Sequence, residues 1–358
     1  MKKGVVIVLV LAIALLFQQC SEDPTVITPP VPPIHTTTPF QIKKPQGFPD
    51  IIEPADNRTT VEGLILGRKL FHEPLLSGNN LQSCATCHQQ GAGFSDFNQF
   101  SMGIDGSIGT RQAMPIMNLV WGTEFFWDGR AFSLEHQALG PVTNPIEMKE
   151  TWPNAVAELK LDSVYNALFY DAFGTYDYDS THVVKAIAQF ERALISGGET
   201  RFDKFLRNEI VLTPSEISGF NIYQSETGGD CFHCHGLSGL MTDNSFHNNG
   251  LDSLQDQTDI GRMAVTGDPA DRASFKTPSL RNVEYTAPYM HDGRFATLEE
   301  VIDFYSEGLH WSPTIDPLMK NVGQGGVQLT PFEKTDLINF LKTMSDPDFL
   351  TNPKFEDQ

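Results

Sequence analysis

Two short segments of the chain carry residue types that can do chemistry. Residues 84–88 read CATCH and residues 231–235 read CFHCH. Cysteines two residues apart also occur in disulfides, zinc sites and thiol-exchange motifs. The His directly after the second Cys decides against these, because C-x-x-C-H is the attachment signature of c-type haem. The two motifs predict two covalent haem c groups, attached at Cys84, Cys87, Cys231 and Cys234, with His88 and His235 as axial iron ligands.

Helical patterns surround each motif at similar places. Val61–Phe71 precedes the first motif, and Thr213 is a good N-cap for a helix before the second. Each half closes with an amphipathic pattern, at Thr181–Ile195 and at Pro331–Met344. Strand signals are few. We therefore expect a mostly α fold of two tandem class-I cytochrome c-like haem domains, at residues 51–200 and 201–358.

A second repeat shows how the two halves differ. DGRAFSLEH starts at Asp128 and DGRFATLEE starts at Asp292. Ser133 caps a helix in the first copy, and Thr297 opens a capping box in the second. Each copy is thus expected to start a helix beside its own haem.

The residue seven places beyond each helix start decides what can bind iron. The second copy has Tyr305 on the apolar face, and the first copy has Pro141 at the equivalent position. Proline has no group that binds iron, and it is expected to end the first helix. Tyr305 is thus the predicted second ligand of the second iron. The alternatives are that Tyr305 is only a core aromatic, or that a rival ligand binds instead, namely Met290, His291 or His310.

Length and charge restrict the classes of function. The chain has 358 residues, enough for two or three domains, and a formal charge of −20. Such acidity excludes nucleic-acid binding, which requires a basic face. The acidity favours a partner protein with a basic face. The alternative is that it only keeps the protein soluble.

The N-terminus has the features of an export signal. Two lysines precede an apolar run that ends at Cys20. Residues 1–19 are predicted to be a signal peptide, and residues 20–50 a Pro/Thr-rich tether after a lipidated Cys20. The alternative is an ordinary cleaved signal with an incidental Cys. The prediction is a protein exported to the periplasmic side, with a lipid anchor as its membrane attachment.

The chain resembles the bacterial diheme cytochrome c peroxidases, which include the methylamine-utilisation diheme enzyme. The resemblance covers about residues 50–345 and is carried by LGRKLFHEPLLS, SCATCH, FFWDGRAFSLEHQALGPV, FKTPSLRN and TAPYMHDGRFATLEEVIDFY. It implies that H2O2 reacts at the N-terminal haem. It also implies that the C-terminal haem receives electrons from a small cytochrome c or cupredoxin, and that the protein can form a homodimer.

The resemblance also assigns site residues. The catalytic Glu of the family falls on Glu135, a position where a carboxylate could act as general base and then acid. The alternative for Glu135 is a surface residue favoured by the helix dipole. The Ca2+ site that family members hold between the domains falls on Gln112, Thr286 and Pro288, with Gln in place of Asn.

Several positions depart from the family pattern. Ile104 stands where many members have a His that blocks the peroxidatic haem at rest. Phe125 replaces a Gln, and Met117 replaces the Trp between the haems, with Trp121 as a candidate relay. The first haem is thus expected to react with peroxide without prior reduction.

Three functions compete. The first is a peroxidase that reduces H2O2 to water. The second is an H2O2-dependent oxidase of a partner protein, which a Tyr305 ligand favours because a phenolate stabilises oxidised iron. The third is a passive diheme electron carrier, which gains nothing from an open iron beside a carboxylate.

Overall fold

A computed structural model describes residues 35–237 and 239–357. The proposed signal peptide, the lipidated Cys20 and the start of the tether lie outside the described residues. From Thr36 onward the chain forms one compact unit. None of the helices in the described part has the length and apolar character that a bilayer span requires.

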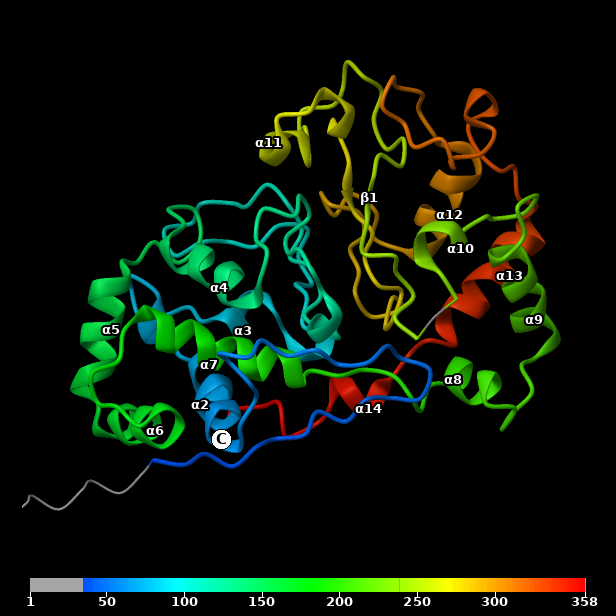
Figure 1. Cartoon of the computed structure of the whole chain (residues 1–358). Coiled ribbons are helices and arrows are strands. Elements are labelled where there is room, and N and C mark those ends of the chain that lie inside the picture. Colours follow the sequence, from blue (N-terminus) through cyan, green and yellow to red (C-terminus); the bar gives the residue numbers. More distant parts are fainter. Residues whose placement is uncertain (1–34, 238, 358) are drawn as a thin grey trace, which may run out of the picture. The chain divides into compact units, whose positions relative to one another are not determined.

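The described chain is mostly helical, as predicted (Figure 1). The first half contains α2 (Val61–Phe71), η1 (Pro74–Leu76), α3 (Cys84–Cys87), η2 (Gln90–Ala92), η3 (Leu119–Trp121), α4 (Leu134–Thr143), α5 (Trp152–Leu161), α6 (Ser163–Phe173) and α7 (Ser180–Ala193). The second half contains α8 (Arg201–Leu206), α9 (Pro214–Tyr223), α10 (Phe232–His235), β1 (Phe246–His247), α11 (Met263–Thr266), η4 (Pro269–Asp271), β2 (Phe275–Lys276), α12 (Leu298–Glu307), η5 (Val322–Gln324), α13 (Pro331–Lys342) and α14 (Pro347–Leu350). The two short strands pair antiparallel.

The same helix crossing occurs in both halves, and glycine permits it. α2 packs on α7, and α9 packs on α13 (Figure 1). A Cβ atom at Gly67 would overlap the backbone carbonyl of Ala186, and one at Gly219 would overlap that of Asp336. In each half, therefore, the helix before the Cys motif crosses the closing helix at a glycine.

Each crossing lies in its own apolar core. One cluster of buried side chains runs from Leu66 to Ile187, and another runs from Phe202 to Met344. The expected N-caps are present: Ser133 on α4, Thr213 on α9 and Thr297 on α12 each accept a hydrogen bond from the backbone N–H three residues ahead. These caps fix where the helices that flank the motifs begin.

One helix boundary differs from the prediction. Pro141 lies inside α4, which continues to Thr143, so the expectation that Pro141 ends the helix is wrong. The missing N–H of proline removes one intrahelical bond. The last turn is closed instead by Asn144, whose N–H donates to Gly140 O (3.0 Å). As a result α4 keeps another turn beside the first motif.

The described end of the expected tether packs on the body. Ile42 and Phe48 are buried. The Phe48 ring lies 5.2 Å from that of Trp121, and the Arg281 guanidinium lies 5.1 Å from the Phe48 ring centre. Two apolar side chains spaced six residues apart give no periodicity, so the sequence pattern alone did not show this packing.

Candidate functional site

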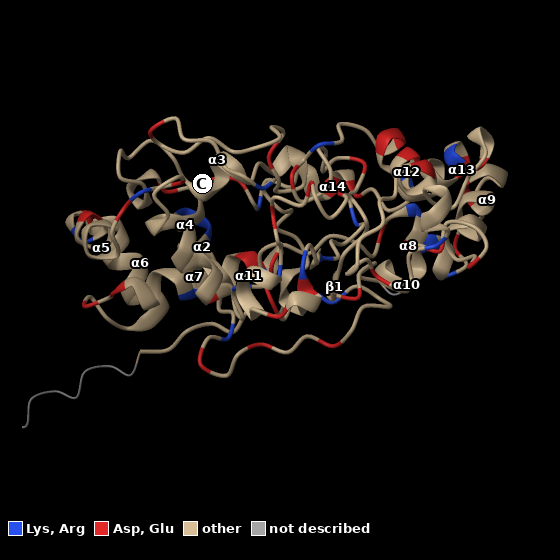
Figure 2. Ribbon diagram, turned by 90° about the horizontal axis from the view of Figure 1, so that it is seen from above, with Lys and Arg blue, Asp and Glu red and all other residues tan. Residues whose placement is uncertain are grey.

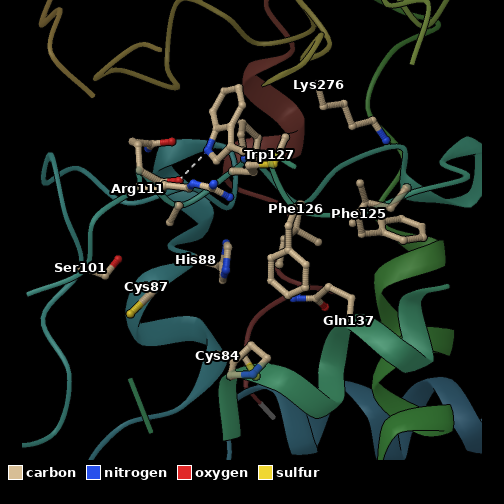
Figure 3. A pocket seen from close by; sticks show the side chains of 18 of the residues that line it. Cys84, Cys87, His88, Ser101, Arg111, Phe125, Phe126, Trp127, Gln137 and Lys276 are labelled. Atoms are coloured by element: carbon tan, nitrogen blue, oxygen red, sulfur yellow. Dashed lines mark hydrogen bonds between the residues drawn. The ribbon is translucent and has the colours of Figure 1, made fainter. Parts of the chain in front are cut away.

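The first Cys motif opens onto a large cavity. α3 presents Cys84 and Cys87, and His88 follows directly as its C-cap. All three side chains line a cavity of about 950 Å³, close to the upper end of the ~300–1,000 Å³ typical of ligand pockets. Figure 3 shows His88 projecting into this space, with Cys87 on one side and Phe126 and Gln137 on the other.

The ring of His88 is held in one tautomer. Because a carbonyl can only accept, Nδ1–H of His88 donates to Phe94 O (2.9 Å). Burial lowers the pKa of His88. The ring is therefore neutral, with the Nε2 lone pair free to bind a metal, the arrangement usual for metal-binding histidines.

The second motif repeats this arrangement. Nδ1 of His235 lies 3.2 Å from Pro278 O, and burial lowers the pKa of His235 to about 4. His233, inside the motif, instead pairs through Nδ1 with Asp230 Oδ1 (2.7 Å). His235 and His233 thus differ in their surroundings: Nδ1 of His235 faces a backbone carbonyl, whereas Nδ1 of His233 faces a carboxylate.

The four motif cysteines do not form the structures that compete with haem attachment. In the described part of the chain, Cys84, Cys87, Cys231 and Cys234 are free thiols. Among residues 35–237 and 239–357, no three His, Cys, Asp or Glu side chains gather as a metal site. Two free thiols beside a neutral, oriented imidazole, in each motif, fit covalent haem.

α4 forms the wall of the cavity across from the motif. Gln137, Ala138, Pro141 and Val142 line the cavity from this helix. Ile104 is not among the lining residues, and its N–H bonds to Glu147 O (3.0 Å).

Glu135 lies on the same helix but is not among the residues that line the cavity. Its Oε1 pairs with the Arg192 guanidinium and accepts a bond from Asn57 Nδ2 (2.6 Å). Burial raises the pKa of Glu135, but Arg192 and Asn57 outweigh burial and hold this pKa below its usual value. Glu135 is thus an anion on α4, one helical turn from Ala138, which lines the cavity.

Tyr305 lies on α12 with the neighbours expected of a residue near the second motif. Its hydroxyl oxygen accepts from Asn249 Nδ2 (3.1 Å). Burial, with smaller contributions from Cys234 and Cys231, raises the pKa of Tyr305 to about 12. Of the rivals, Met290 also contacts Asn249, His291 stacks on Phe275 and His310 is exposed.

The expected calcium residues come from segments that meet. Gln112 is buried, and its backbone N–H donates to His291 O (2.8 Å). Its side-chain Nε2 donates to Ser95 Oγ (2.9 Å), so the amide oxygen is not used in that bond. Thr286 is buried close to Gly93, and Pro288 follows two residues later.

Several functional candidates were missed in the sequence. Arg111 and Lys276 line the cavity, whereas Arg281 pairs with Asp203, and Arg294 pairs with Asp252 and Asp292. Arg192 and Glu191, at the end of α7, were also missed. They look like ordinary charges at the end of a helix, and only their contacts reveal them.

Comparisons with known proteins agree with this site. The family model described as di-haem cytochrome c peroxidase matches residues 61–210. The methylamine utilization protein MauG of Methylorubrum extorquens is 37% identical over 317 residues, which are 88% of this chain and 86% of that protein. The cytochrome c551 peroxidase of Nitrosomonas europaea is 37% identical over 66% of this chain and 71% of its own length.

A solved structure is also similar. The crystal structure of a MauG-like protein associated with microbial copper homeostasis superposes with a TM-score of 0.80 at 35% identity, covering 89% of this chain and 99% of that one. Together with two Cys-His motifs in similar helical surroundings, these matches show that the chain belongs to the di-haem cytochrome c peroxidase family.

Proposed function

We propose that this protein is a diheme c-type peroxidase that reduces H2O2 to water with electrons from a small redox protein. The observation that carries this proposal is the cavity that His88 lines, with one wall formed by α4, the helix that also bears the anionic Glu135. Cys84 and Cys87 would attach one haem, and Cys231 and Cys234 the other, with His88 and His235 as iron ligands. The iron of the first haem supplies the redox centre at which peroxide binds.

The two halves would be tandem cytochrome c-like domains, at residues 51–200 and 201–358. The repeated glycine crossings and the two separate apolar cores support this division. The burial of Ile42 and Phe48 supports a folded part that begins before residue 51.

Glu135 would move the proton that peroxide cleavage requires. Splitting the O–O bond heterolytically moves a proton from one peroxide oxygen to the departing one, and a carboxylate can accept and return it. A carboxyl whose pKa lies below its usual value is ionised at neutral pH, as a base must be. Asn57 and Arg192 both bind Oε1 of Glu135, and Oε2 is the second oxygen of this carboxylate.

The remaining expectations concern partners and location. Acidic side chains are spread over the molecule, including α12, which carries Tyr305 (Figure 2). This distribution supports a donor with a basic face, such as a cytochrome c or cupredoxin. We further propose export to the periplasmic side, anchoring through Cys20, a homodimer, and Ca2+ at Gln112, Thr286 and Pro288.

Oxidation of a partner protein is the second candidate function. It is favoured by Tyr305, since a phenolate ligand stabilises oxidised iron. The similarity to a methylamine utilization protein also supports it. Steady-state reduction of H2O2 by reduced cytochrome c separates the two: a peroxidase turns over, an oxidase of a partner does so poorly, and a passive carrier does not.

The as-isolated protein should react with H2O2 without prior reduction. Ile104 is not among the residues lining the cavity, and Pro141 has no group that binds iron. We expect the EPR spectrum of the diferric protein to contain a high-spin signal that changes on adding H2O2. A spectrum that is entirely low-spin and inert until half-reduced would mean that another side chain covers the first iron.

Replacing Tyr305 by Met should change the second haem and leave the first unaltered. Thioether ligation raises the reduction potential of haem iron relative to phenolate. We expect the low-spin EPR signal to change and the potential of that haem to rise, while the high-spin signal stays as in the wild type. A low-spin signal identical to wild type would remove Tyr305 from the coordination sphere and favour Met290.

A further inference from the structure

Glu191 is a buried carboxyl that the reaction as described does not use. It lies on α7 and lines the cavity of the first motif together with Ile187. Glu191 is only 3% exposed, and its Oε2 has no hydrogen-bond partner among the described residues. Leaving a buried polar group unpaired costs about 1–3 kcal/mol, so such a group calls for an explanation.

The neighbouring arginine does not neutralise Glu191. The guanidinium of Arg192 pairs with Glu135 and donates from Nη1 to Asn57 O (3.1 Å). The pKa of Glu191 is raised to about 8, because burial and, to a smaller extent, the charge of Glu135 together outweigh the lowering effect of Arg192. At neutral pH, Glu191 therefore carries a proton while Glu135 does not.

We propose that Glu191 is an internal proton donor to the peroxide cavity, acting as the acid beside Glu135 as the base. This role rests on the proposed peroxidase function. Reduction of H2O2 to two waters breaks one O–O bond and consumes two electrons and two protons. The electrons come from the donor protein. Glu191 supplies one of the two protons, is left as a carboxylate, and recovers its proton from water. Solvent supplies the second proton.

The surroundings of Glu191 keep its proton in place at rest. The charged and titratable groups that face it are Arg192 on its own helix, Glu135 on α4 and Cys84 on α3, as their electrostatic interactions show. The other elements packed on α7 contribute mainly apolar or uncharged residues. They include Gly67 and Phe71 of α2, Leu119 of η3, Leu159 of α5, and Phe169 and Tyr165 of α6.

The expected pH dependence follows from the direction of the shift. A carboxyl whose pKa is raised is neutral below that pKa and ionises as the pH rises through it. The donor is thus present at pH 7 and lost above about pH 8. Peroxide turnover should fall on the alkaline side, although water can replace part of the lost donor.

The test uses the holoprotein and two readouts. Infrared spectroscopy of the wild type should show a neutral-carboxyl band at pH 7 that disappears as the pH rises through about 8, and Glu191→Gln should lack this band. At pH 7, Glu191→Gln should lower peroxide turnover by about 10–100-fold, which is less than the full ~10²–10⁴ of acid–base catalysis. The turnover rate of this variant should no longer fall as the pH rises above about 8. Haem content confirms that the variant folds.

Glu158→Gln is the matched control. Glu158 also has a buried oxygen without a partner, but it lies on α5 and is not among the residues that line the cavity. This variant should keep the pH profile and rate of the wild type. A wild type without a neutral-carboxyl band at pH 7, or an unchanged pH profile in Glu191→Gln, would overturn the proposal. A wild type that does not turn over peroxide but keeps the band would overturn the peroxidase function, and the donor role with it.

Discussion

Replacing His88 by Ala is expected to abolish peroxide turnover and to remove the high-spin haem signal. His88 is the only side chain of the first motif with a nitrogen, and Phe94 O orients it so that Nε2 points away from the backbone. Without this ligand, iron in the first cavity has no proximal partner from the motif. The measurement is the EPR and visible spectrum of the purified variant beside its steady-state rate with H2O2.

Two further variants serve as controls. His235→Ala should instead alter the low-spin signal, because His235 has the equivalent position in the second motif. His233→Ala should leave both signals intact, since the ring of His233 pairs with Asp230 and His235 is the proposed ligand. If His235→Ala left both haems unchanged, the assignment of the second domain would be wrong.

The helical frame and the motif residues were predictable because their signals are local. Thr213, Thr297 and Ser133 cap helices through bonds only three residues long, and the Cys-His spacing is read directly from five consecutive residues. Local hydrogen bonds and helix periodicity depend on neighbours in the sequence.

The contacts around Glu135 were not predictable in this way. Glu135 lies 78 residues after Asn57, and Arg192 lies 57 residues after Glu135. In the sequence, each of the three looks like a surface residue. The burial of Phe48 against Trp121 and Arg281 also joins distant segments. A pattern in one segment cannot show which other segment covers it. The resemblance named Glu135, but only the fold shows what sets its charge.

Replacing Glu135 by Gln is expected to slow peroxide turnover by about 10²–10⁴-fold while both haems remain bound. Gln keeps nearly the same size and can still accept from Asn57, but it has neither the negative charge nor the capacity to take a proton. The carboxylate is ionised in the folded protein because Arg192 and Asn57 outweigh burial. The rate should be measured per haem-containing molecule.

Stability needs a separate measurement, because Arg192 is nearly fully buried and loses its ion partner. Removing one member of a buried pair costs up to ~3–5 kcal/mol, and less here since Glu135 is partly exposed. Denaturant unfolding should therefore be measured beside the kinetics. Glu299→Gln changes the exposed repeat partner on α12 and serves as the control, with an expected wild-type rate.

A rate loss below about threefold in fully haem-loaded Glu135→Gln would reduce Glu135 to a structural partner of Arg192. Acid–base work in the cavity would then fall to another titratable group that lines it, such as the carboxyl of Glu191 on α7.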